Sequence, residues 1–177
     1  MKGHSSRITG VEFIDQGRNF ITCGSDGLCL LYETSSGQVI SKILDGGAGK
    51  LNCISISKFD EKIDTEEKPD LFFGSGLEYC WIGSETGELI AISIVGKERL
   101  YHESFATAIN CITTSDNTTF AGTDSGDIII ITTNNHKVIR LKCILIYTVI
   151  FFQFFATKRV SIGSNSITNI IIKDDLR

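Results

Sequence analysis

The residues that could do chemistry are few and far apart. The three histidines are His4, His102 and His136, and their spacing fits no zinc-binding pattern. The GxSxG and HExxH patterns of hydrolases and metalloproteases do not occur in the sequence. We therefore expect no metal site, no cofactor and no catalytic centre.

One glycine-rich stretch faintly resembles a phosphate-binding loop. Residues 46–50 read Gly-Gly-Ala-Gly-Lys, but the phosphate-loop pattern also needs a glycine at 44 and Ser or Thr at 51. Both of those positions hold leucine. We interpret the stretch as a flexible link between two structural units.

The six cysteines fall within or beside apolar runs and form no CxxC pair. They are Cys23, Cys29, Cys53, Cys80, Cys111 and Cys143. Cysteines in such surroundings are typically reduced core residues. Reduced cysteines indicate a cytosolic or nuclear protein, because disulfides are rare in those compartments. The expected location is therefore cytoplasmic, nuclear or both.

A tight turn that recurs three times organises the chain. Its first copy is Gly24-Ser25-Asp26-Gly27, which leads into the apolar run 28–32. Asp-Gly between two apolar runs favours a β-hairpin. Related turns at 83–87 and 122–126 also precede apolar runs. Three copies of one hairpin indicate a repeat array.

The first unit contains four short strand-like stretches in about 42 residues, the period of a propeller blade. The expected strands are 8–13, 20–23, 28–32 and 38–44, separated by polar or glycine-containing turns. Seventeen glycines against one proline suit a chain with many tight turns. With 42% apolar and 21% charged residues, the chain has enough apolar sequence for a core.

The first unit resembles a WD40 repeat. Gly3-His4 precedes the first strand, the Asp26 turn joins strands two and three, and Tyr32-Glu33 stands where the family has Trp-Asp. The resemblance implies that His4, Thr22, Asp26 and Tyr32 form the family's structural tetrad of His, Ser/Thr, Asp and Trp. This network ties a loop to the blade, so we interpret His4 and Asp26 as scaffold residues and not as a catalytic pair.

The expected fold is all-β, with three WD40-type propeller blades and the first strand of a fourth. We place the units at 1–45, 46–96 and 97–135, followed by an apolar insert and an incomplete blade at 136–177. The fourth start is predicted at 166–172, which repeats the pattern of 51–54 and 109–112. Because three blades cannot close a ring, we expect the isolated chain to be marginally stable or to aggregate.

The second unit carries a charged insert at 58–70. Residues 60–70 contain six acidic residues and two lysines, Lys62 and Lys68, so their net charge is −4. This equals the net charge of the whole chain. The acids are Asp60, Glu61, Asp64, Glu66, Glu67 and Asp70. Such a run is typical of a solvated loop, and it is also our candidate docking patch for a basic partner.

An uncharged apolar segment at 143–156 has no alternation and no turn residue. At about 14 residues it is short for a membrane helix, which needs about 20. Three interpretations stay open: a buried strand or helix, a short membrane-associating segment, or translated intron sequence from an incorrect gene model. We regard a membrane role as the weakest of the three.

Several further stretches resemble the C-terminal part of the proteasomal ATPase-associated factor family of WD40 proteins. They include 15–20, 108–111 and 120–128, in the same order as in that family. The resemblance implies a non-enzymatic assembly chaperone or regulator that binds an ATPase subunit of the 19S regulatory particle. The alternative is a WD40 adaptor of a ubiquitin ligase or of ribosome biogenesis. The acidic net charge argues against nucleic acid as the main partner.

Overall fold

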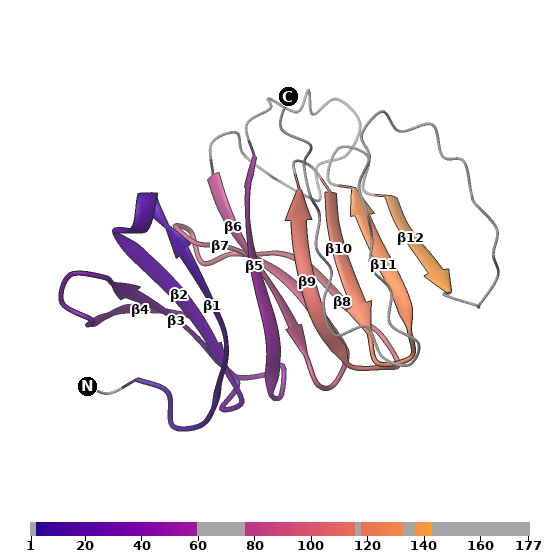
Figure 1. Cartoon of the computed structure of the whole chain (residues 1–177), viewed down its shortest axis with the longest axis horizontal. Coiled ribbons are helices and arrows are strands. Elements are labelled where there is room, and N and C mark those ends of the chain that lie inside the picture. The colour runs from indigo at the N-terminus through magenta and orange to yellow at the C-terminus, as the bar shows by residue number, and fades with distance from the viewer. Residues whose placement is uncertain (1–2, 60–76, 116–117, 133–136, 143–177) are drawn as a thin grey trace.

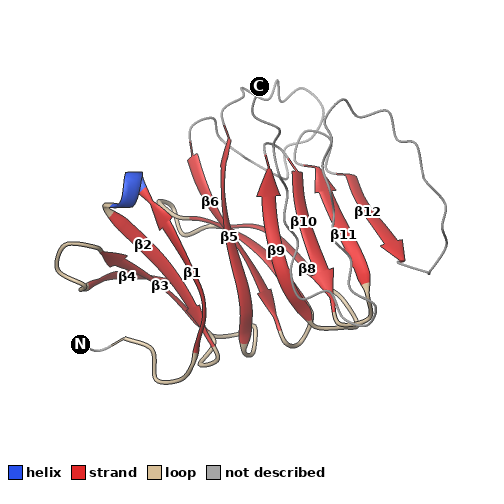
Figure 2. Ribbon diagram, in the orientation of Figure 1, coloured by secondary structure: helices blue, strands red, loops and turns tan. Residues whose placement is uncertain are grey.

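The protein forms three antiparallel sheets that stand side by side, from the N-terminal sheet at the left of Figure 1 to the third sheet at the right. The computed structural model describes residues 3–59, 77–115, 118–132 and 137–142. Each sheet has four strands in chain order, so every connection inside a sheet joins neighbouring strands. Figure 2 shows that strands dominate the described residues. The expected all-β fold is confirmed.

The strands of the first sheet are β1 (Ile8–Ile14), β2 (Asn19–Gly24), β3 (Leu28–Glu33) and β4 (Val39–Asp45). A three-residue 3-10 turn, η1 (Asp15–Gly17), joins β1 to β2. The strands of the second sheet are β5 (Leu51–Phe59), β6 (Leu77–Ser84), β7 (Glu88–Ser93) and β8 (Arg99–Ser104). The strands of the third sheet are β9 (Ile109–Ser115), β10 (Thr118–Thr123), β11 (Asp127–Thr132) and β12 (Lys137–Lys142).

The second and third sheets end later than the units expected from sequence. β8 pairs with β7, so the second sheet continues to Ser104 and the boundary expected after residue 96 is too early. β12 pairs with β11, so the third sheet continues to Lys142, beyond the boundary expected after residue 135. Both strands are outermost in their sheets and rich in charged residues, which weakens the apolar signal of a strand.

Two apolar layers hold the sheets together. The first joins residues of the first and second sheets, including Ile21, Cys23, Ile54 and Ile82. The second joins residues of the second and third sheets, including Trp81, Leu89, Ile109 and Ile129. Burying one such aliphatic side chain stabilises the fold by roughly 1.5–3 kcal/mol, so the sheets depend on their neighbours for stability.

Cysteines contribute to both layers. All five described cysteines, Cys23, Cys29, Cys53, Cys80 and Cys111, are buried. The sulfur atoms of Cys29 and Cys80 lie 3.9 Å apart across the first layer. Burial raises the pKa of Cys23 and of Cys111 to about 11, so these thiols stay protonated at neutral pH.

Several sequence predictions lie outside the described residues. They are the acidic patch at 60–70, the apolar segment at 143–156 and the strand at 166–172. Within the described residues, no helix has the length and apolar character to span a membrane.

Candidate functional site

The recurring turn has the same backbone in all three sheets. The amide of the last glycine donates to the carbonyl three residues earlier, from Gly27 to Gly24, Gly87 to Ser84 and Gly126 to Thr123, at 3.0, 3.3 and 3.2 Å. These glycines have φ angles of +78°, +88° and +78°. L-residues with side chains rarely adopt that conformation, which explains why glycine recurs there.

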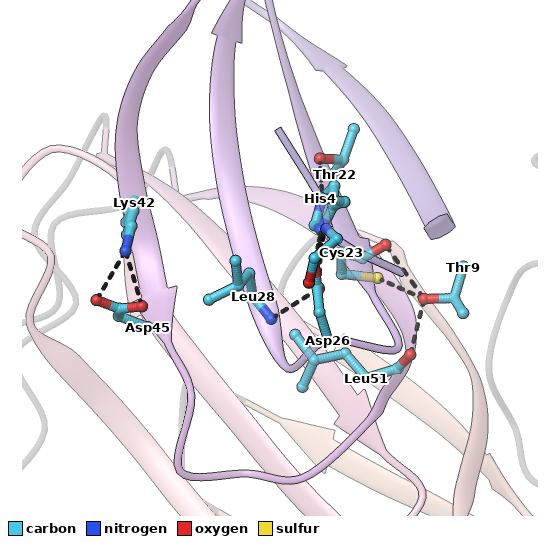
Figure 3. Close-up of polar contacts among 10 residues, drawn as sticks. His4, Thr9, Thr22, Cys23, Asp26, Leu28, Lys42, Asp45 and Leu51 are labelled. Atoms are coloured by element: carbon cyan, nitrogen blue, oxygen red, sulfur yellow. Dashed lines mark hydrogen bonds and ion pairs between the residues drawn. The ribbon is translucent and has the colours of Figure 1, made fainter. Parts of the chain in front are cut away.

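In the first sheet, an imidazole closes this turn (Figure 3). Nδ1 of His4 lies 2.9 Å from Oδ1 of Asp26, and Nε2 of His4 lies 2.7 Å from the hydroxyl of Thr22. The backbone amides of Ser5 and Leu28 donate to the same carboxylate at 2.7 and 3.2 Å. The network therefore fastens the segment before β1 to both β2 and the turn.

The hydrogen bonds determine the ionisation of Asp26. Burial raises the pKa of Asp26, but hydrogen bonds from His4, Ser5 and Leu28 outweigh it and hold that pKa below its usual value. Because an ionised carboxylate only accepts hydrogen bonds, Nδ1 of His4 carries a hydrogen. In the neutral imidazole, Nε2 then accepts from the Thr22 hydroxyl.

A hydroxyl, an imidazole and a carboxylate in this order form the arrangement that activates a nucleophile in many hydrolases. Here the hydroxyl is inaccessible, because Thr22 is 3% exposed and the side chains of His4 and Asp26 are 2% and 6% exposed. A substrate cannot reach a buried threonine in the middle of β2. The geometry suits a structural clasp and not a catalytic triad.

The structure brings three of the four expected tetrad residues together by hydrogen bonds. Tyr32, the fourth, makes a different contact: its ring stacks on Phe20 with centroids 4.9 Å apart and planes 1° from parallel. Its hydroxyl lies against Gly3, where an added Cβ would be 2.7 Å from the oxygen. Tyr32 therefore packs over the face of the first sheet beside the clasp and does not extend the hydrogen-bonded chain.

The second and third turns are closed by hydroxyls of their own. Ser84 bonds to the Thr86 hydroxyl at 3.0 Å and accepts from the Glu88 amide at 2.9 Å. Thr123 takes the same role, with bonds of 3.0 Å to the Ser125 hydroxyl and from the Asp127 amide. Among the described residues, no histidine bonds to these turn hydroxyls, but the Thr86 hydroxyl also donates to the Ala48 carbonyl at 3.1 Å, in the segment before β5.

A polar groove of about 400 Å³ runs across the three sheets where their first strands begin. Each sheet supplies three equivalent positions: the residue before its first strand, a residue near the start of that strand, and a turn residue. The lining residues are Arg7, Thr9, Ser25, Lys50, Asn52, Glu85, Ala108, Asn110 and Asp124. The turns concerned lie along the lower edge of the sheets in Figure 1. We call this surface the inner-strand groove.

The same backbone bond shapes the groove in each sheet. The amides of Ser25, Glu85 and Asp124 donate to the carbonyls of Arg7, Lys50 and Ala108 at 2.8, 2.8 and 3.0 Å. This repeated bond holds each turn against the start of its first strand. The groove is therefore a direct product of the repeat.

Charge changes along the inner-strand groove. The first sheet contributes Arg7, the second contributes the Lys50–Glu85 ion pair at 3.0 Å, and the third contributes Asp124. Asn110 donates to Asp124 at 3.3 Å. One end of the groove is thus basic and the other acidic, which suits an extended partner segment that carries both charges.

Sequence reasoning did not find the inner-strand groove. The signal was present, because the turn repeat aligns Ser25, Glu85 and Asp124, and the echo of 50–54 by 108–112 aligns the strand starts. The acidic patch at 60–70 lies outside the described residues, but its flanking strands are described. Phe59 and Leu77 pair at the end of β5 and β6 that is far from the groove.

Comparisons with known proteins agree with this architecture. No protein-family model matches the sequence. Over 63 residues the chain is 38% identical to a guanine nucleotide-binding protein subunit beta-like protein of Encephalitozoon cuniculi (strain GB-M1), a match that covers 36% of this chain and 18% of that protein. The solved structure of U3-55K superposes with a TM-score of 0.60 at 12% identity, over 79% of this chain and 40% of that one.

The crystal structure of the RRP9 WD40 repeats superposes equally well, with a TM-score of 0.60 at 12% identity and the same coverage of 79% and 40%. The fold is that of WD40-repeat propeller blades. Each of the three sheets is one WD40 blade, and this chain spans less than half the length of either solved chain. Proteins built from WD40 blades act as protein-interaction scaffolds, and the fold is typically non-catalytic.

Proposed function

We propose that this chain is a non-enzymatic scaffold that binds a protein segment in the inner-strand groove. The observation that carries the proposal is the groove itself, to which three WD40 blades contribute equivalent positions that are polar except at Ala108. The His4–Asp26 network is buried and lies outside the groove lining, so it serves the blade and not a substrate.

The proposed partner is an ATPase subunit of the 19S proteasome regulatory particle. Support comes from the stretches that resemble the proteasomal ATPase-associated factor family, including 108–111 and 120–128. The groove adds a chemical requirement: an extended segment with an acidic group opposite Arg7 and a basic group opposite Asp124.

The test is binding of purified regulatory-particle ATPase subunits, one at a time, to the immobilised chain. Arg7→Glu and Asp124→Lys each place a like charge opposite the proposed partner, so we expect each to weaken binding about tenfold or more at low salt. Lys42→Glu is the matched control, because Lys42 is an exposed lysine of β4 whose ion pair with Asp45 lies outside the groove. If Lys42→Glu weakens binding and neither Arg7→Glu nor Asp124→Lys does, the groove assignment is contradicted.

The acidic patch at 60–70 is a second proposed contact, for a basic tail of the same partner. Replacing its six acids by Ser or Asn should weaken binding and flatten its dependence on salt concentration. Unchanged affinity would leave the patch as a solvated insert. If no ATPase subunit binds, while components of a ubiquitin ligase or of ribosome biogenesis do, the proteasomal part of the proposal is wrong.

A further inference from the structure

Two cysteine sulfurs meet in the first apolar layer, between the first and second sheets. Sγ of Cys29, on β3, lies 3.9 Å from Sγ of Cys80, on β6, and one thiol donates a weak hydrogen bond to the other. Both side chains are 0% exposed. The sulfurs of a disulfide are about 2.05 Å apart, so a small approach separates this contact from a covalent bridge between two sheets.

The repeat itself does not require thiols at these two positions. The pairing of β6 with β7 places Leu89 of the second sheet at the position that Cys29 has in the first. The pairing of β9 with β10 places Thr119 of the third sheet at the position that Cys80 has in the second. Leu89 and Thr119 are 0% and 2% exposed. A buried side chain is common to these positions, and the thiol contact is particular to the first layer.

Cys23 is a third cysteine of the same layer and provides an internal comparison. It lies opposite Cys29 in the pairing of β2 with β3, so both belong to the first sheet. Its sulfur lies 3.3 Å from the hydroxyl of Thr9 on β1. A bridge from Cys29 to Cys23 would stay within one sheet, whereas a bridge to Cys80 would connect two.

The closed layer protects the pair from oxidants. Burial raises the pKa of the Cys80 thiol well above its usual value, and the thiolate is the form that attacks an oxidant. Between β4 and β5 the chain joins the two sheets through residues 46–50 alone. Local opening of the layer exposes both sulfurs to solvent, and closure brings them back into contact.

We propose that Cys29 and Cys80 are an oxidisable pair, which hydrogen peroxide converts into a disulfide between the first and second sheets. In the opened layer, the thiolate of one cysteine attacks a peroxide oxygen; the O–O bond breaks, a sulfenic acid forms, and the leaving hydroxide takes up a proton to become water. The sulfur of the other cysteine then attacks the sulfenic sulfur. The S–S bond forms, the S–O bond breaks, and the departing hydroxide leaves as water with the proton of the second thiol. Two thiols thus lose two electrons, and one peroxide is reduced to two water molecules.

The bridge should stabilise the closed layer. It joins residues that are 51 positions apart in the sequence, and a cross-link of this kind restricts the unfolded chain. The urea midpoint of the oxidised chain should therefore lie above that of the reduced chain. Dithiothreitol, which reduces the disulfide, should return the midpoint to its original value.

The test treats the full chain with hydrogen peroxide, blocks the remaining thiols with iodoacetamide and analyses tryptic peptides by mass spectrometry without reduction. Cys23 and Cys29 share the peptide 19–42. Cys80 lies in the peptide 63–97, because Pro69 prevents cleavage after Lys68. The proposed bridge joins these two peptides, whereas a Cys23–Cys29 bridge closes a loop within the first.

Cys23→Ala is the matched control, because it removes a neighbouring thiol of the same layer and should leave the yield of joined peptides unchanged. Cys29→Ala and Cys80→Ala should each abolish them, and circular dichroism verifies that each variant is folded. A second comparison needs no variant. In concentrated urea the bridge between Cys23 and Cys29 should dominate, because short loops close more readily than long ones. The folded chain should favour the bridge between Cys29 and Cys80 instead.

Three results would overturn the proposal. One is the absence of joined peptides after oxidation of the chain without urea. Another is the same pattern of bridges with and without urea, which would mean that the contact between the sheets does not direct the reaction. The last is joined peptides that persist in Cys29→Ala and disappear in Cys23→Ala, which would place the bridge at Cys23.

Discussion

The first turn and the two later turns share a backbone but differ in the side chains that close them. His4 and Asp26 close the first turn with a carboxylate and an imidazole from a segment about 20 residues away, whereas Ser84 and Thr123 close the others with hydroxyls from the turn itself. One backbone thus tolerates closure by a carboxylate and an imidazole from a separate segment, and closure centred on hydroxyls of the turn. In the later turns Thr86 also donates to the Ala48 carbonyl and Ser125 to the Asp127 carboxylate. In these WD40 blades the backbone of the turn is constant, and the side chains that close it vary.

The two ways of closing the turn exclude each other sterically. Gly24 occupies the position that Ser84 and Thr123 occupy in the later turns. A Cβ at Gly24 would lie 2.7 Å from Nδ1 of His4 and 2.8 Å from Oδ1 of Asp26. A side chain at this position and an inserted histidine therefore compete for the same space.

The largest effect should come from removing the carboxylate of the first turn. Asp26→Ala leaves His4 and two backbone amides without their acceptor, and loss of one partner of a buried pair typically costs about 3–5 kcal/mol. Thr86→Ala, the equivalent change in the second turn, should cost about 1 kcal/mol. Urea unfolding followed by circular dichroism measures both, and equal losses would contradict the comparison.

The next largest loss of stability should come from placing a side chain at position 24. Gly24→Ser should cost about 2 kcal/mol, because the new Cβ overlaps His4 and Asp26. In a His4→Ala background the same substitution should cost less, since the contact with Nδ1 of His4 is gone and the Asp26 side chain, no longer held by the imidazole, can move away from the new Cβ. A double-mutant cycle of unfolding free energies gives the coupling directly. Additive effects would show that the two groups do not compete.

A smaller effect is expected in the second turn. Ser84→Ala removes one hydroxyl that bonds to Thr86 and to the Glu88 amide, at an expected cost of about 1–2 kcal/mol. Hydrogen exchange should then accelerate at the amides of the β6–β7 turn and stay unchanged in the first sheet. Faster exchange around Asp26 would mean that the turns are not independent.

The smallest effect is restricted to acid. The pKa of Asp26 is below its ordinary value of 3.8, so its contribution to stability is complete above that value and is lost as pH falls through the lower pKa of the folded state. Hydrogen bonding from His102 also lowers the pKa of Glu88, so the comparison with Asp26→Asn isolates the first turn. Urea midpoints between about pH 2 and pH 6 should fall less steeply in Asp26→Asn. Identical slopes would exclude Asp26 as a source of acid sensitivity.

The sequence predicted features that depend on local signals. The Asp26 turn, its two relatives and the strands of the first sheet are recognisable because glycine and alternating apolar residues mark them. β8 and β12 were assigned to the wrong units, because an outermost strand carries charges that hide its alternation. The inner-strand groove was missed because its nine lining residues are separate in the sequence and meet only through the repeat.

Tyr32 shows a further limit of sequence reasoning. Its position after the turn matched the tetrad pattern, but an aromatic ring can satisfy that position by stacking. The choice between a hydrogen bond to Thr22 and a stack on Phe20 depends on three-dimensional packing that the sequence motif does not encode.

The buried cysteines can report the separation of neighbouring sheets. Cys23, Cys29 and Cys80 lie in the layer between the first two sheets at 0% exposure, so a thiol reagent reaches them only when those sheets separate. Cys53 lies in the layer between the second and third sheets. The alkylation rate of each cysteine, measured by mass spectrometry of its peptide, would therefore report how often each layer opens. No cysteine has to be introduced for this measurement.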